Sequence, residues 1–183
     1  MKRLILFFIS VWASGILFAQ KPFPYHRMDT IEINRFGVSL KNAWGGGLNT
    51  PVLNEIDLDW DGTKDLVVFD SYSGNIKTFL NDGISGTASY TLAPEYEAEF
   101  PRSLNLEQFM LLRDYNCDGK EDLFTYRLGG IAVYENIGSA ATGHQWSLLF
   151  DYLPAIVFNQ PSGVYISPID IPSIEDMDGD GDL

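Results

Sequence analysis

A short acidic motif recurs three times in this chain and limits its possible folds more than any other feature. It reads Asp-x-Asp/Asn-x-Asp-Gly, and its copies begin at Asp57, Asp114 and Asp176, 57 and 62 residues apart. Self-similarity at such a period is typical of folds built from copies of one supersecondary unit, in which each unit needs a neighbour to cover its apolar face. The sequence therefore predicts a repeat protein with units of about 60 residues.

The spacing inside the motif predicts a calcium loop. A hard cation takes six to eight oxygen ligands, and a tightly coiled loop turns alternate residues inward. Side-chain oxygens at loop positions 1, 3, 5 and 9 would surround the ion together with the backbone carbonyl at position 7, and glycine at position 6 permits a positive φ. The glycines are Gly62, Gly119 and Gly181. The predicted ligands are Asp57, Asp59, Asp61, Thr63 and Asp65 in the first loop, Asp114, Asn116, Asp118, Lys120 and Asp122 in the second, and Asp176, Asp178, Asp180 and Asp182 in the third, with Thr63, Lys120 and Asp182 acting through their carbonyls.

These loops have two alternative interpretations. A helical calcium loop of the EF-hand or dockerin type needs an acidic residue at position 12 and a helix after it. Position 12 is Val68 in one copy and Thr125 in the other, and both lie in strand-like sequence. An acidic surface turn without metal stays open, but the first loop would then hold four carboxylates within nine residues, and their mutual repulsion favours a bound cation.

The segments after each loop predict an all-β fold. Residues 66–69 and 76–80 are β-branched or aromatic runs on either side of a polar turn, and residues 123–126 and 131–134 repeat the pattern around Gly129-Gly130. Such pairs are typical of hairpins. Further short strand candidates are residues 89–92, 109–112, 145–150 and 163–166. Each unit is thus expected to hold about four strands and no long helix.

These loops and the lead-in Trp44-Gly45-Gly46-Gly47-Leu48-Asn49-Thr50-Pro51 resemble FG-GAP or VCBS-type repeats, which build integrin-α-like β-propellers in secreted and cell-surface bacterial proteins. The resemblance covers residues 43–183. It implies a partial β-propeller with Ca²⁺ in many of its blades and ligand binding on its faces. It also implies about three repeats here, the last cut within its loop at Leu183, with the remaining blades expected in a longer chain.

The N-terminus predicts export. Lys2 and Arg3 precede an apolar run, and small Ala19 ends it, as in a secretory signal peptide over residues 1–19. An uncleaved membrane anchor is the alternative, although the apolar run is shorter than the roughly 20 residues that a bilayer requires. Residues 20–42 are then a lead-in or first strand before the repeats. We expect a secreted or cell-surface protein with no membrane span after cleavage.

Charge and cysteine content narrow the function. The chain has 12 Lys plus Arg against 25 Asp plus Glu, a net charge of −13, which argues against nucleic-acid binding because phosphates require a basic face. The single Cys117 cannot form an internal disulfide. A nucleophile role for Cys117 is disfavoured, because neither His26 nor His144 lies in a recognisable partner motif. The sequence nominates no catalytic residue and no organic cofactor site.

The expected function is therefore binding or adhesion, with an extracellular glycan or protein as the ligand. Two alternatives stay open, namely a calcium-dependent polysaccharide lyase or hydrolase on a propeller, and a scaffold for a downstream domain. Exposed aromatic side chains could stack on sugars. The candidates are Trp44, Trp60, Tyr72 and Trp146. Trp60 is the best candidate for an exposed ring, because it occupies position 4 of a loop.

Overall fold

The structure is a computed structural model that describes residues 28, 30–157 and 159–176. The predicted signal peptide and the third-loop residues Asp178, Asp180 and Asp182 lie outside the described residues. The chain separates into two compact units, residues 1–31 and 32–183, and every element below belongs to the second. Within the described part of the chain, no helix is long and apolar enough to cross a membrane.

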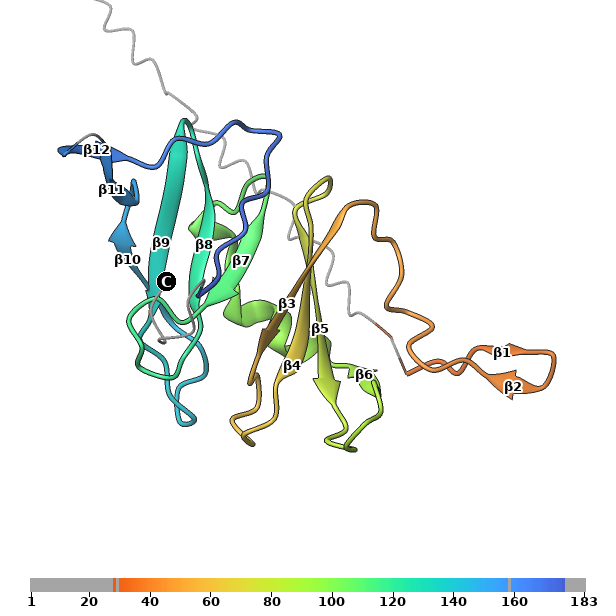
Figure 1. The fold of residues 1–183 in the computed structure, drawn as a ribbon. Coiled ribbons are helices and arrows are strands. Elements are labelled where there is room, and N and C mark those ends of the chain that lie inside the picture. The colour runs from red at the N-terminus through yellow and green to blue at the C-terminus, as the bar shows by residue number, and fades with distance from the viewer. Residues whose placement is uncertain (1–27, 29, 158, 177–183) are drawn as a thin grey trace, which may run out of the picture. The chain divides into compact units, whose positions relative to one another are not determined.

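Two four-stranded antiparallel sheets form the body of the second unit (Figure 1). The strands of the first sheet are β3 (Pro51–Ile56), β4 (Asp65–Asp70), β5 (Asn75–Asn81) and β6 (Tyr90–Leu92). Those of the second are β7 (Met110–Arg113), β8 (Asp122–Arg127), β9 (Gly130–Asn136) and β10 (Trp146–Phe150). In each sheet every strand pairs with the next one along the chain. The prediction of a mostly β chain with antiparallel hairpins is confirmed.

The remaining elements are short. They are the hairpins β1 (Asn34–Arg35) with β2 (Val38–Ser39) and β11 (Pro154–Val157) with β12 (Gln160–Gly163), and the 3₁₀ helices η1 (Pro94–Glu99) and η2 (Arg102–Leu104). The expected strand at residues 163–166 is wrong, because the last strand lies earlier. Its register with β11 pairs Pro154 with Gly163 and ends there. Ile166 then enters the core, where its side chain is buried.

The sheets pack on each other through a shared apolar core. The first sheet contributes Ile56, Val67 and Phe69, and the second contributes Met110, Leu112, Leu123, Ala132 and Tyr134. Fully burying one such large side chain contributes about 1.5–3 kcal/mol. Successive side chains on a strand point to opposite faces, so Phe124 belongs to a second cluster on the other face of β8. The second sheet is therefore apolar on both faces.

A buried amide also joins the two sheets. The Nδ2 atom of Asn54 donates to the Met110 carbonyl at 2.9 Å, and the Leu112 N–H donates to its Oδ1 at 2.9 Å. Asn42 makes the same pair of bonds to the edge strand β6, with Tyr90 at 2.7 Å and Leu92 at 2.8 Å. Each amide thus satisfies one N–H and one C=O on the open side of a strand, as a neighbouring strand would.

Candidate metal centre

The first acidic loop connects β3 to β4 and gathers three carboxylates. Asp57 follows the last residue of β3, and Asp65 is the first residue of β4. Carboxylate oxygens of Asp57, Asp59 and Asp61 all lie within 4.8 Å of one another. Asp57 is half-buried, whereas Asp59 and Asp61 are exposed. Because three carboxylates at this separation repel one another unless a positive charge lies between them, the cluster could hold a metal ion.

Backbone N–H groups of the loop turn these side chains inward. Asp57 accepts from the N–H of Asp61 at 3.0 Å and of Gly62 at 2.8 Å. Asp59 also accepts from Asp61, at 3.2 Å, and Asp61 accepts from the N–H of Thr63 at 2.7 Å. A carboxylate offers about four lone-pair sites, so each side chain can accept these bonds and still present an oxygen to a cation.

The second loop, between β7 and β8, repeats this pattern bond for bond. Asp114 accepts from the N–H of Asp118 at 3.1 Å and of Gly119 at 2.8 Å. Asn116 accepts from Asp118 at 3.1 Å, and Asp118 accepts from the N–H of Lys120 at 2.9 Å. Two segments 57 residues apart therefore share one local structure as well as one sequence pattern.

Backbone conformation agrees with the glycine prediction and adds a second constraint. Gly62 and Gly119 have φ of 89° and 86°, in the region that a Cβ disfavours. Position 4 is left-handed as well, with φ of 64° at Trp60 and 60° at Cys117. The third copy carries Gly179 at that position, which was the available sequence signal for this conformation.

Asp65 and Asp122, the predicted position-9 ligands, are buried beneath the loops. Asp65 accepts from the N–H of Leu58 at 2.8 Å and of Asn81 at 2.7 Å. Burial raises the pKa of both carboxyls, and the other carboxylates of each loop act in the same direction. Asp122 accepts in the same way from the N–H groups of Tyr115 and Asn136. Each carboxylate therefore bonds its loop to the end of a neighbouring strand. A cation beside them would offset the cost of burying their charge.

The structure leaves the other predicted ligands less defined. Thr63 and Lys120 follow the position-6 glycines, and their role as carbonyl ligands stays a prediction. Asp176 lies at the end of the described residues and is exposed. Because the rest of the third loop lies outside the described residues, the ligand set there also stays a prediction.

Lysine side chains distinguish the two loops. The Lys120 Nζ atom lies 3.1 Å from Asp118 Oδ2 and donates to the Asn136 carbonyl at 2.6 Å. Burial raises the pKa of Asp118, but the bonds from the Lys120 N–H and ammonium outweigh it and lower that pKa overall. Lys64 instead pairs with Glu121, which lies in the second loop just before β8. The second loop thus contains an ammonium group and a neutral ligand side chain, Asn116.

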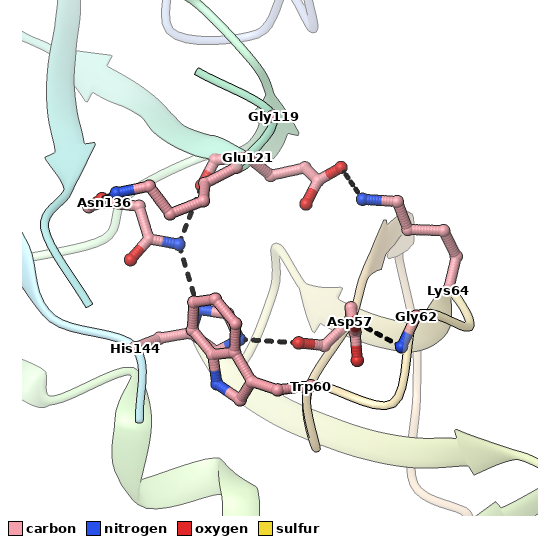
Figure 2. A pocket seen from close by; sticks show the side chains of 9 residues that line it. Asp57, Trp60, Gly62, Lys64, Gly119, Glu121, Asn136 and His144 are labelled. Carbon is pink, nitrogen blue, oxygen red and sulfur yellow. Dashed lines mark hydrogen bonds and ion pairs between the residues drawn. The ribbon is translucent and has the colours of Figure 1, made fainter. Parts of the chain in front are cut away.

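A cavity of about 250 Å³ lies between the two loops, where the first loop meets the second sheet (Figure 2). The indole of Trp60 stacks on the His144 ring, with 4.9 Å between ring centroids and 25° between planes. His144 Nε2 lies 3.0 Å from the Asp57 carbonyl, and its Nδ1 lies 2.9 Å from Asn136 Nδ2. Since a carbonyl only accepts, Nε2 carries the proton and Nδ1 accepts from the Asn136 amide. Burial lowers the pKa of His144 and favours this neutral form.

The expectation that Trp60 is the best candidate for exposure among the four aromatics is wrong. Its ring is half-buried, and its Nε1 atom is buried with no hydrogen-bond partner among the described residues. The Trp60 side chain, at position 4 of the first loop, projects toward the second repeat, and its indole covers the His144 ring. Trp146 is also largely internal, because its Nε1 donates to the Glu99 carbonyl at 2.7 Å. Tyr72 and Trp44 are more open, with 81% and 42% of their surface exposed.

The sequence interpretation missed the residues that join the loops. Asn136 could have been found from the repeat pattern, because Asn81 occupies the matching position in the first repeat. The two side chains accept from the N–H groups of Gly83 and Gly138, respectively. His144 had no such signal. The strand registers place Ala88 at the matching position of the first repeat, so the imidazole is not part of the repeated pattern.

Comparisons of the chain with models of protein families, with curated proteins and with solved structures found no match.

Proposed function

We propose that this chain is part of a secreted or cell-surface binding module, built from FG-GAP or VCBS-type repeats and stabilised by calcium. The observation that carries the proposal is the pair of acidic loops with identical hydrogen-bond patterns, each of which leads into a four-stranded antiparallel sheet. In this proposal the ions are structural. The ligand is an extracellular glycan or protein, and the module is not an enzyme.

The donor set supports calcium. Carboxylates, an amide oxygen and backbone carbonyls are hard oxygen ligands, which suit Ca²⁺ and Mg²⁺ better than softer transition metals. A flexible loop with several carboxylates favours Ca²⁺, since Mg²⁺ demands near-octahedral geometry and keeps much of its water. The net charge of −13 adds long-range attraction for cations.

The position of the first loop supports a structural role for the ion. The loop itself contacts the second repeat through Trp60, the Asp57 carbonyl and Lys64, whose partners His144 and Glu121 lie beside the strands of the second sheet. An ion that orders this loop would also order those contacts. Binding energy from the ion would then stabilise the packing of adjacent sheets.

The arrangement of successive repeats supports a propeller. The first two sheets share one core, and the second is apolar on its other face as well. Residues just before the third motif lie beside the second sheet, where Arg113 donates from Nε to the Ile174 carbonyl at 2.9 Å and pairs with Glu175 at 2.7 Å. Serial packing of such sheets is the pattern from which propellers are built.

Terbium luminescence tests the metal proposal at the first loop. Tb³⁺ replaces Ca²⁺ in oxygen sites and emits when a nearby indole is excited, and Trp60 lies within the loop. We expect emission that saturates with Tb³⁺ and is displaced by Ca²⁺. The double variant Asp59→Asn/Asp61→Asn should lose most of it, and the control Asp151→Asn, outside the loops, should keep it. Equal emission from the double variant and the wild type would refute a site at this loop.

A further inference from the structure

A second cavity, of about 340 Å³, lies at the opposite end of β4 from the acidic loop. One wall is the β4–β5 turn with Ser71 and Tyr72, and the other is the turn at residues 168–171. Gln108, the second residue before β7, closes it between them. The volume falls within the roughly 300–1,000 Å³ of small-molecule sites. None of these residues belongs to the acidic loops.

Both walls are held by hydrogen bonds within their own turns. Asp70 accepts from the N–H of Thr50 at 2.8 Å and from the Ser73 hydroxyl at 2.6 Å, and its carbonyl accepts from Gly74 at 2.7 Å. On the other side, Asp170 N–H donates to the Ser167 carbonyl at 3.1 Å. Each turn is thus ordered in advance, which lowers the entropy cost of binding.

The side chains that line the cavity combine an open aromatic ring with exposed polar groups. Tyr72 is 81% exposed although its ring is large and apolar. The Ser71 hydroxyl is buried with no hydrogen-bond partner among the described residues. That atom is closed off from the cavity, so the polar side chains that an occupant can reach are the exposed Gln108 and Asp170. Asp170 is the charged residue of the lining.

These features fit one class of ligand. A sugar ring presents a face of C–H groups that stacks on an aromatic ring and a rim of hydroxyls that donate to and accept from serine, amide and carboxylate groups. Uronates, sulfated glycans and phosphates would meet the Asp170 carboxylate and a net charge of −13. We infer that this cavity binds a neutral carbohydrate, with Tyr72 stacking on its ring and Gln108 and Asp170 bonding to its hydroxyls. The inference rests on the proposed function and narrows its ligand to neutral glycans.

A glycan array followed by calorimetry tests the inference on the full chain. The array carries neutral gluco-, manno-, galacto- and xylo-oligosaccharides beside uronate-containing and sulfated ones, and the best neutral oligosaccharide is then titrated. We expect Tyr72→Ala to weaken its binding at least tenfold and Gln108→Ala to weaken it less. The matched control is Tyr165→Ala, because Tyr165 is 79% exposed and lies outside this cavity. It should bind as the wild type does.

Three results would overturn the inference, namely binding of only anionic glycans, binding of no glycan, and equal binding by Tyr72→Ala and the wild type. The calcium-dependent rise in Tm is measured on the same samples. If that rise persists while the glycan result fails, the carbohydrate site alone is wrong. If the rise is absent from the wild type, the proposed calcium-stabilised module is wrong as well.

Discussion

The Nε2 atom of His144 donates to the backbone carbonyl of Asp57 across 3.0 Å, although the two residues are 87 positions apart in the sequence. Asp57 opens the first acidic loop, and His144 precedes the last strand of the second sheet. The bond therefore connects a candidate cation ligand to the neighbouring repeat. Trp60 covers the same imidazole, so the loop and the sheet share one buried contact.

Replacing His144 tests how much this contact stabilises the packing of the sheets. His144→Ala removes two buried hydrogen bonds, worth about 1 kcal/mol each, and a ring stack worth roughly 0.5–1.5 kcal/mol. We expect a loss of about 2–4 kcal/mol in the free energy of unfolding, measured by urea denaturation. Trp60→Phe keeps a ring over the imidazole and should cost less than about half of that. A His144→Ala variant as stable as the wild type would show that the contact is not formed in solution.

The buried amide of Asn54 gives a second test. Asn54→Leu leaves the Leu112 N–H and the Met110 carbonyl without their partners inside the core. Each unsatisfied buried group costs roughly 1–3 kcal/mol, so we expect a loss of at least about 2 kcal/mol. Asn42→Leu removes the same pair of bonds at an edge strand that water can reach, and it should cost less. Equal losses would contradict the difference in burial.

The two loops should differ in affinity for Ca²⁺. The first loop offers four carboxylates. In the second loop one of these positions holds the neutral Asn116, and the Lys120 ammonium group forms an ion pair with Asp118. Affinity of calcium loops rises with the number of ligand charges, so we expect the first loop to bind about tenfold or more tightly. Calorimetry should show two classes of site, with the tighter lost in Asp61→Asn. Lys120→Gln should strengthen the weaker class, and an unchanged weaker class would argue against competition by the ammonium.

Asp70 makes stability depend on acid pH. Its carboxylate is buried, and bonds from the Ser73 hydroxyl and then the Thr50 N–H lower its pKa below the usual 3.8. A carboxyl whose pKa is lowered by folding adds stability above the unfolded pKa, and that stability is lost as the pH falls through the folded value. We expect the difference in unfolding free energy between the wild type and Asp70→Asn to shrink from pH 6 to pH 2.5. A constant difference would show that the charge of Asp70 does not matter.

Features repeated along the chain were predictable from sequence, and contacts between repeats were not. The spacing of Asp57 and Asp114 located both loops, and Gly62 and Gly119 at position 6 have the positive φ that was expected. These features are local, so composition and spacing encode them directly. His144 has no counterpart in the first repeat, and its partners in the first loop, Asp57 and Trp60, lie far away in sequence. Trp60 was misjudged for the same reason, since only the neighbouring sheet determines which of its faces is covered.

The most direct test of the account is a thermal melt of the full chain in calcium and in a chelator, for the wild type and the double variant Asp61→Ala/Asp118→Ala. An ion that binds only the folded protein raises stability by about 2.7 kcal/mol at a hundred times its dissociation constant. The account predicts a Tm that rises with calcium in the wild type and does not respond to calcium in the double variant. A wild-type Tm that is the same in calcium and in chelator would contradict it.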